Sequence, residues 1–113
     1  MNKKKILIVD DEIDFCHLMK LYFVNKNYEV AICTTLSEAN VIMPSYQPHI
    51  ILLDNNLPDG FGWDSAPVIA ERDKSVQLYL ISAYNDAKNF SASHSNITIL
   101  EKPLSMDVLE EIF

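Results

Sequence analysis

ILIVDDE, residues 6–12, places four consecutive apolar residues directly before three acids. Two other segments have a similar arrangement: IILLD at residues 50–54 and ITILEKP at residues 97–103. Continuous apolar runs of this length are typical of strands that are covered on both faces, as in a parallel sheet. The three segments therefore predict three buried parallel strands, each followed by charged residues.

The charged residues at these strand ends are the candidate functional residues. Ligands of open α/β sheets bind beyond the carboxyl ends of the strands, so Asp10, Asp11, Asp54 and Lys102 are expected to converge on one edge. Two carboxylates roughly 5 Å apart repel by about 3 kcal/mol at an effective dielectric constant of about 20. A bound cation is the usual compensation for such crowding, so the pattern indicates a ligand site.

Composition limits the classes of protein that need to be considered. A chain of 113 residues, 49% of them hydrophobic, fits one globular domain rather than a disordered segment. The net charge of −7 argues against direct binding to nucleic acid or to an anionic membrane surface. The basic start is followed by only four apolar residues, so no signal peptide is expected and the predicted location is the cytoplasm. Cys16 and Cys33 have no metal-binding spacing and are predicted to be buried thiols.

Strand and helix patterns alternate along the chain. The predicted strands cover Ile6–Val9, Tyr28–Thr34, His49–Leu53, Val76–Ile81 and Ile97–Leu100. The predicted helices begin at cap residues Asp14, Ser37 and Ser105, the second one stops before Pro44, and a further one covers roughly Trp63–Arg72 with Pro67 in its first turn or at a kink. Tyr84–Asn96 is polar and predicts a short or irregular fourth helix, and the final helix is expected to place Met106, Leu109 and Phe113 on one face. This alternation predicts an α/β fold with a five-stranded parallel sheet and helices on both faces.

The residues at successive strand ends also form an ordered set. Asp10 and Asp11 follow the first strand, Asp54 the third, Ser82 the fourth and Lys102 the fifth. In this order, and with the local sequences IVDDE, LDNNLPDG, ISAY and EKP, the chain resembles the receiver domain of two-component response regulators. The resemblance covers nearly the whole chain and implies a flavodoxin-like fold with strand order 2-1-3-4-5.

The resemblance also implies a chemistry for the strand ends. Asp54 is expected to accept a phosphoryl group as an acyl phosphate, with Lys102 and Ser82 contacting phosphoryl oxygens. The expected metal is Mg²⁺, or Mn²⁺, held by Asp11 and Asp54, by Asp10 through a water, and by the backbone carbonyl of Asn56. The Lys102–Pro103 bond is expected to be cis. Such a domain is regulatory rather than an enzyme, although it assists its own phosphorylation and dephosphorylation.

One departure from the family pattern concerns the relay away from this site. Receivers usually carry Tyr or Phe three residues before the lysine, and here that position is Ile99. An interaction module that works without phosphorylation, with impaired switching, is therefore an open alternative. A phosphatase of the haloacid-dehalogenase type is a weaker one, because that chemistry needs an acid two residues after the nucleophile, where this chain has Asn56.

The resemblance implies partners as well. A sensor histidine kinase or a phosphotransfer protein is expected to supply the phosphoryl group, and an effector domain or protein is expected to receive the signal. Homodimer formation stays open. Residues 1–113 are expected to form a single receiver domain; whether its last helix is truncated from a longer chain or ends a stand-alone receiver also stays open.

Overall fold

Five parallel strands form the central sheet of the computed structural model, which describes residues 3–82 and 94–113. The sheet order is β2-β1-β3-β6-β7, which confirms the predicted order 2-1-3-4-5 because β6 and β7 are the fourth and fifth parallel strands along the chain. The strands are β1 (Lys5–Val9), β2 (Glu29–Cys33), β3 (Ile50–Asp54), β6 (Gln77–Ser82) and β7 (Ile97–Glu101). A separate two-stranded antiparallel pair, β4 (Asn56–Leu57) and β5 (Gly60–Phe61), follows β3 directly.

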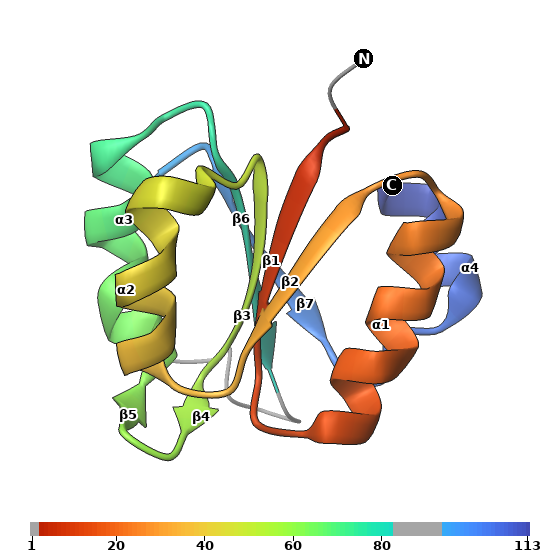
Figure 1. Ribbon diagram of the computed structural model, residues 1–113, viewed down its shortest axis with the longest axis horizontal. Helices are drawn as coiled ribbons and strands as arrows, with labels where there is room; N and C mark the ends of the chain where they lie inside the picture. Colours follow the sequence, from red (N-terminus) through yellow and green to blue (C-terminus); the bar gives the residue numbers. More distant parts are fainter. Residues whose placement is uncertain (1–2, 83–93) are drawn as a thin grey trace.

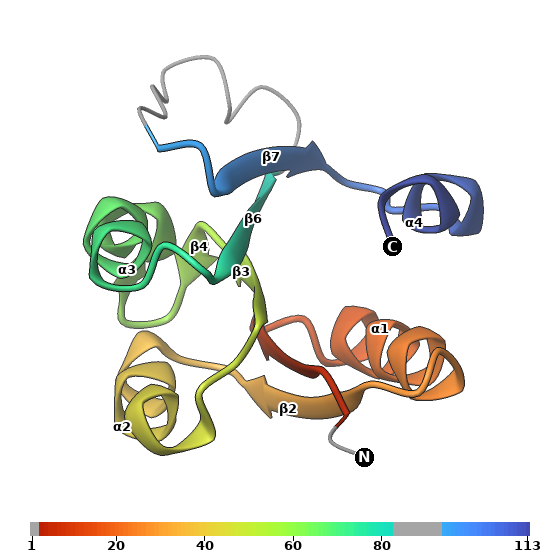
Figure 2. The same ribbon diagram turned by 90° about the horizontal axis from the view of Figure 1, so that it is seen from above.

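Helices cover both faces of the sheet, as predicted. Figures 1 and 2 show α2 and α3 on one face and α1 and α4 on the other. The helices are α1 (Ile13–Asn25), α2 (Leu36–Tyr46), α3 (Ala66–Arg72) and α4 (Met106–Ile112). The parallel strands run toward the bottom of Figure 1, so their carboxyl ends share one edge of the molecule with β4 and β5.

The buried residues form two hydrophobic layers, one on each face of the sheet. Leu7 and Val9 of β1 pack in the layer under α2 and α3, whereas Ile6 and Ile8 pack in the layer under α1 and α4. Successive strand residues point to opposite faces, so a strand between two helical layers must be apolar at every position. This geometry explains the unbroken apolar runs in the sequence.

Two predicted helix starts are wrong by two residues each. The N-cap of α1 is Glu12 rather than Asp14, and the N-cap of α2 is Thr35 rather than Ser37. The Thr35 hydroxyl oxygen accepts a hydrogen bond from the Glu38 amide at 3.1 Å. Serine and threonine are both preferred N-cap residues, so local preference alone does not fix the start of α2 at Ser37.

The predicted end of α2 before Pro44 is also wrong, because the helix continues to Tyr46. Pro44 cannot donate to the Asn40 carbonyl four residues earlier. Both residues are exposed on the outer side of the helix, where solvent can hydrogen-bond that carbonyl. A proline on this side of a last helical turn is therefore tolerated.

Of the two alternatives for Pro67, the first-turn position is confirmed. A 3₁₀ turn at Gly62–Ser65 leads into α3, and Pro67 lies in the first turn of that helix, where a backbone donor is not needed. The predicted cap of the last helix is also confirmed, since the Ser105 hydroxyl oxygen accepts from the Val108 amide. Leu109 is buried, but Met106 is exposed, so the predicted common apolar face of this helix is wrong at Met106. Most of the predicted fourth helix lies outside the described residues.

Candidate functional site

The three aspartates meet at the carboxyl edge of the sheet, as predicted. Asp10 follows β1 and Asp54 ends β3, and these two strands are neighbours with Val9 opposite Leu53. One carboxylate oxygen from each of Asp10, Asp11 and Asp54 lies within 4.8 Å of the others. Asp10 and Asp54 are buried, whereas Asp11 is exposed and leaves the group open to solvent.

A close backbone contact fixes the chain after Asp54. The Gly62 amide donates to the Asn55 carbonyl at 2.9 Å, and a Cβ atom at position 62 would collide with the Asp54 carbonyl oxygen. The indole nitrogen of the buried Trp63 donates to the Leu53 carbonyl at 3.3 Å. The turn after β5 therefore packs directly against the backbone of the candidate phosphoacceptor, and only glycine fits at position 62.

Hydrogen bonds fix the position of Asp10, but one of its carboxylate oxygens lacks a hydrogen bond from the described residues. Its Oδ1 accepts from the Glu12 amide at 2.9 Å, and its carbonyl accepts from the Cys16 thiol at 3.2 Å. Its Oδ2 lies 3.0 Å from the Lys102 ammonium as an ion pair, but no well-directed hydrogen bond reaches this buried oxygen from the described residues. An incompletely satisfied carboxylate oxygen is a natural ligand for a cation.

Lys102 is the counter-charge of the site, although its nearest partners are not Asp54. Its Nζ lies 3.0 Å from Asp10 Oδ2, 3.1 Å from Glu12 Oε2 and 4.0 Å from Asp54 Oδ1. The same ammonium lies 4.3 Å from the centre of the Phe15 ring. Burial lowers the pKa of Lys102, but its contacts with Asp10 and Glu12 outweigh burial and raise the pKa above its ordinary value. The adjoining Lys102–Pro103 peptide is cis, as expected.

The buried carboxylates are costly in their charged form. Burial, and next the negative charge of Asp10, raise the pKa of Asp54 to about 6. Burial also raises the pKa of Asp10, against the opposing effects of the Glu12 amide and of Lys102. Perturbed carboxyl groups in one cluster at a strand edge are typical of functional sites.

The residues present fit a hard divalent cation such as Mg²⁺. The donor set consists of oxygen atoms only, one of them lacks a directed hydrogen bond, and an exposed acid leaves room for water ligands. The Asn56 carbonyl begins β4, two residues after Asp54, and its role as a ligand stays a prediction.

Ser82 lies close to the acids in the sheet. It ends β6, and in the pairing with β3 the residue before it, Ile81, is opposite Asp54. Ser82 is buried, and its hydroxyl donates a long hydrogen bond of 3.5 Å to the Leu100 carbonyl. Its proposed contact with a phosphoryl oxygen stays a prediction. Ile99, at the usual aromatic position, is half-buried in β7 and packs against the layer under α2 and α3.

Two acids at this edge have partners that sequence reasoning did not foresee. Glu12 pairs with Lys102, ninety residues away along the chain. Asp59, in the turn between β4 and β5, accepts hydrogen bonds from the amides of Leu36 and Ser37 at 2.8 and 2.9 Å. These two amides begin α2, and they lower the pKa of Asp59. No local sequence signal indicates a partner so distant along the chain.

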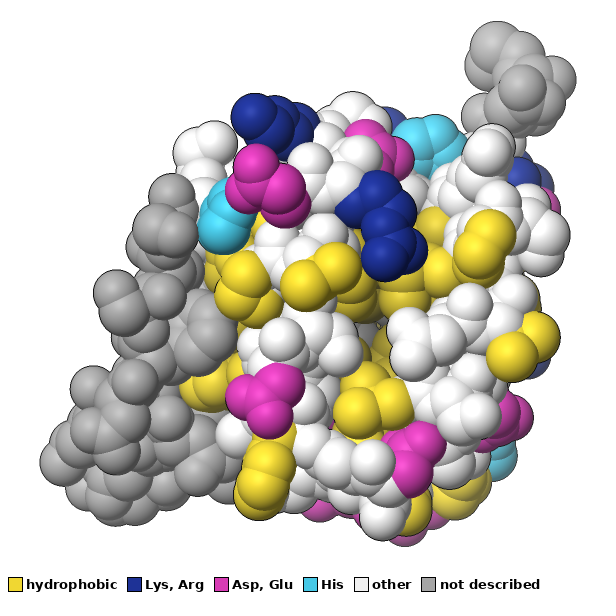
Figure 3. Space-filling model, turned by 90° about the vertical axis from the view of Figure 1, so that its left-hand side faces the viewer, with side chains coloured by type: hydrophobic (Ala, Val, Ile, Leu, Met, Phe, Trp, Pro, Cys, Tyr) yellow, Lys and Arg dark blue, Asp and Glu magenta, His cyan; other side chains and the backbone are white. Residues whose placement is uncertain are grey.

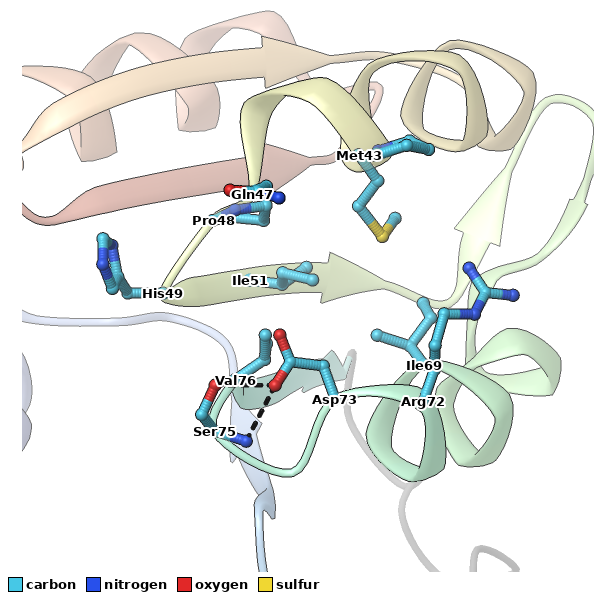
Figure 4. A pocket seen from close by; sticks show the side chains of 11 residues that line it. Met43, Gln47, Pro48, His49, Ile51, Ile69, Arg72, Asp73, Ser75 and Val76 are labelled. Atoms are coloured by element: carbon cyan, nitrogen blue, oxygen red, sulfur yellow. Dashed lines mark hydrogen bonds between the residues drawn. The ribbon is translucent and has the colours of Figure 1, made fainter.

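A separate hollow of about 520 Å³ lies at the opposite edge, between the last turns of α2 and α3. Figure 3 views the face with these helices, and Figure 4 shows Met43 above Ile51, with Ile69 and Arg72 reaching in from α3. The hollow is formed near the amino end of β3, away from the acids. No described helix is long and apolar enough to cross a membrane.

A five-stranded parallel sheet of this order, with an acid cluster and a lysine at its carboxyl edge, defines a flavodoxin-like α/β domain with a candidate ligand site. The family model described as "Response regulator receiver domain" matches residues 6–113. The chain therefore belongs to the response regulator receiver domain family, which is regulatory.

Two similar proteins are response regulator protein PilR of Pseudomonas aeruginosa and sporulation initiation phosphotransferase F of Bacillus subtilis. PilR is 27% identical over 99% of this chain and 26% of its own length, whereas the phosphotransferase is 24% identical over 98% of this chain and 91% of its own length. The chain thus spans about a quarter of the length of PilR. Among solved structures, the complex of histidine kinase ThkA with response regulator protein TrrA matches with a TM-score of 0.79 and 26% identity, over 96% of this chain and 94% of the matched chain.

Proposed function

We propose that this domain is a phosphorylation-controlled switch of two-component signalling, working in the cytoplasm. The observation that supports this proposal is the buried Asp54 carboxylate at the sheet edge, with Asp10, Asp11 and Lys102 around it. Phosphoryl transfer needs mainly positioning and neutralisation of charge, and this cluster offers both.

The proposed step is a transfer to an Asp54 carboxylate oxygen. That oxygen forms a new bond to phosphorus while the bond from phosphorus to the donor breaks. The donor leaves with the electron pair, as imidazole from a phosphohistidine or as acetate from acetyl phosphate. Lys102 and the Ser82 hydroxyl then each bind an oxygen of the new acyl phosphate.

Asp10, Asp11 and Asp54 would hold the metal ion. When bound, Mg²⁺ supplies positive charge next to the transferring oxygens. Each protein residue has its own role. Asp54 presents the nucleophilic oxygen. The hydrogen bond from the Glu12 amide holds the carboxylate of the buried Asp10 in place beside Asp54, where it would help to bind the metal ion.

The proposed phosphodonor is a sensor histidine kinase or a phosphotransfer protein. Helix α1 begins next to the acids and exposes more than half of each of Ile13, Leu18, Leu21 and Val24. Exposed apolar side chains gathered on one helix indicate a protein-binding surface. A related chain is part of a structure of a histidine kinase in complex with a response regulator protein. The signal would pass to an effector domain or protein, or to a second copy of the chain.

The test is labelling by acetyl phosphate with Mg²⁺, read as the mass gain of one phosphoryl group. Wild type should be labelled, and Asp54→Asn should not, because an amide cannot form the acyl phosphate. Asp59→Asn is the matched control, since it changes an acid five residues away and should be labelled normally. Labelling that persists in Asp54→Asn would refute the assignment.

Ile99 favours one second candidate, an interaction module that works without phosphorylation. Its half-buried aliphatic side chain in β7 replaces the aromatic ring that the family resemblance leads us to expect. Amide spectra with and without beryllofluoride, a phosphoryl mimic, separate the two functions. Shifts confined to the residues around Asp54 would favour the module, and shifts that spread beyond the site would favour the switch.

A further inference from the structure

The position of the Lys102 ammonium is the feature that leads beyond the proposed function. It lies about as close to Glu12, at 3.1 Å, as to Asp10, at 3.0 Å, but 4.0 Å from Asp54. The Phe15 ring faces the same ammonium at 4.3 Å. Three groups from the β1–α1 region therefore hold Lys102 on one side of the site, short of contact with the phosphoacceptor.

Glu12 can be separated from the rest of the site. It is not one of the three acids that could share a metal ion, and its side chain is 63% exposed. It is the N-cap residue of α1, but its side chain makes no capping hydrogen bond. Its carboxylate instead binds Lys102. A neutral side chain at position 12 would therefore remove the ion pair without removing a capping hydrogen bond from the helix start.

We propose that Glu12 is a positioning residue that restrains Lys102 and so lowers the affinity of the site for a phosphoryl group. This inference rests on the proposed function. A metal ion held by Asp10, Asp11 and Asp54 would offset the charge of Asp10, but the charge of Glu12 would remain. Glu12 then competes with the phosphoryl oxygens for the same ammonium, and release of Lys102 from Glu12 accompanies its approach to Asp54.

The size of the effect follows from the exposure of Glu12. Exposed ion pairs contribute up to about 1 kcal/mol, which corresponds to about a fivefold change in an equilibrium constant. Glu12→Gln keeps the size of the side chain and removes its charge. We expect it to strengthen binding of beryllofluoride at saturating Mg²⁺ by about two- to fivefold. Trp63 is the only tryptophan and bonds to the residue before Asp54, so its fluorescence can report the binding.

Asp14→Asn is the matched control for charge. Asp14 is an exposed acid in the first turn of α1, two residues after Glu12. Among the described residues, the carboxylates that pair with Lys102 are those of Asp10, Glu12 and Asp54, so Asp14 is not one of its partners. Like Glu12→Gln, the substitution Asp14→Asn removes one negative charge near the site. The proposal predicts a larger gain in affinity for Glu12→Gln than for Asp14→Asn; equal gains, or no gain in either variant, would overturn it.

A second measurement needs no metal and no phosphoryl mimic. The rate of acylation of Lys102 by acetic anhydride, followed by mass spectrometry of the labelled peptide, reports how freely its amine is available. Glu12→Gln should raise this rate about two- to fivefold, whereas Asp14→Asn should leave it close to wild type. An unchanged rate in Glu12→Gln would overturn the proposal. A raised rate in a protein whose wild type does not bind beryllofluoride would support the restraint and refute the phosphoacceptor function instead.

Discussion

The two ends of the parallel strands differ in how their polar groups are satisfied. At the carboxyl ends, the buried Asp10 and Asp54 share one lysine, and their pKa values are raised. At the amino ends, the Tyr46 hydroxyl donates to the carbonyls of Glu29 and Ile6, and the Lys5 amide donates to the His49 ring. One end buries two like charges, whereas the charged residues that begin β1 and β2 at the other end, Lys5 and Glu29, are not buried. The carboxyl end, where the candidate site lies, therefore lowers the stability of the fold, as is common at functional sites.

The comparison can be broken most directly at Lys102. Lys102→Ala leaves Asp10 and Asp54 without their cation, so we expect a loss of about 1–3 kcal/mol in the free energy of unfolding at pH 7 without metal; Lys102 is partly exposed, so this lies below the usual cost of breaking a buried pair. Urea denaturation measures this loss. The matched variant is Lys26→Ala, which breaks an exposed ion pair with Glu110 of 2.8 Å and should cost clearly less. Equal losses in the two variants would show that Lys102 stabilises the buried carboxylates no more than Lys26 stabilises an exposed one.

The next largest effect is expected at Asp54. Its folded pKa of about 6 lies above the ordinary value of 3.8, so its charge opposes folding above pH 6 and has no effect below about pH 4. Asp54→Asn should therefore raise the free energy of unfolding at pH 7 without metal by about 1–2 kcal/mol. The gain should shrink as the pH falls from 6 to 4.

Asp59→Asn should change the free energy of unfolding in the opposite direction, although Asp59 lies at the same edge of the sheet. The amides of Leu36 and Ser37 lower the pKa of Asp59, so its carboxylate stabilises the fold above its ordinary pKa, and this contribution is lost as the pH falls through the lowered value. Asp59→Asn should therefore destabilise the protein at pH 7. Denaturation curves of both variants between pH 4 and 8 test the pair, and a stability gain in both would contradict the assigned environments.

The smallest effect is expected at the amino end. Tyr46→Phe removes a hydroxyl that donates to backbone carbonyls, which should cost about 0.5–1.5 kcal/mol. Burial raises the pKa of Tyr46 to about 12, so the loss should be the same from pH 5 to pH 8. Tyr28→Phe is the control, because the Tyr28 hydroxyl has no hydrogen bond to the described residues. A loss in Tyr46→Phe that varies with pH in this range would show that this end is also coupled to charge.

The strands and their acids could be predicted because the signals are local. A strand buried on both faces must be apolar throughout, and the residue that follows it lies at the sheet edge wherever the strand is placed. Asp10 and Asp54 could therefore be assigned to one edge before their strands were known to be neighbours. The strand order itself came from the resemblance and was then confirmed.

The contacts that were missed join distant parts of the chain. Glu12 was not foreseen as the N-cap of α1, and its pairing with Lys102 depends on how β7 lies relative to α1. The error at Pro44 has a different cause, since the rule that a helix ends before proline does not consider whether the freed carbonyl faces solvent. Local propensity sets where a helix can begin or end, and tertiary exposure decides among these positions.

The hydrogen bonds of Asp59 tie the start of α2 to the loop that follows Asp54, the proposed phosphoacceptor. Because one carboxylate accepts from both Leu36 and Ser37, a shift of that loop by less than an ångström would lengthen both bonds together. These two amides then exchange their hydrogens with solvent at rates that follow the position of the loop. A chemical event at Asp54 would thereby be readable in the first turn of a helix that begins eighteen residues earlier in the chain.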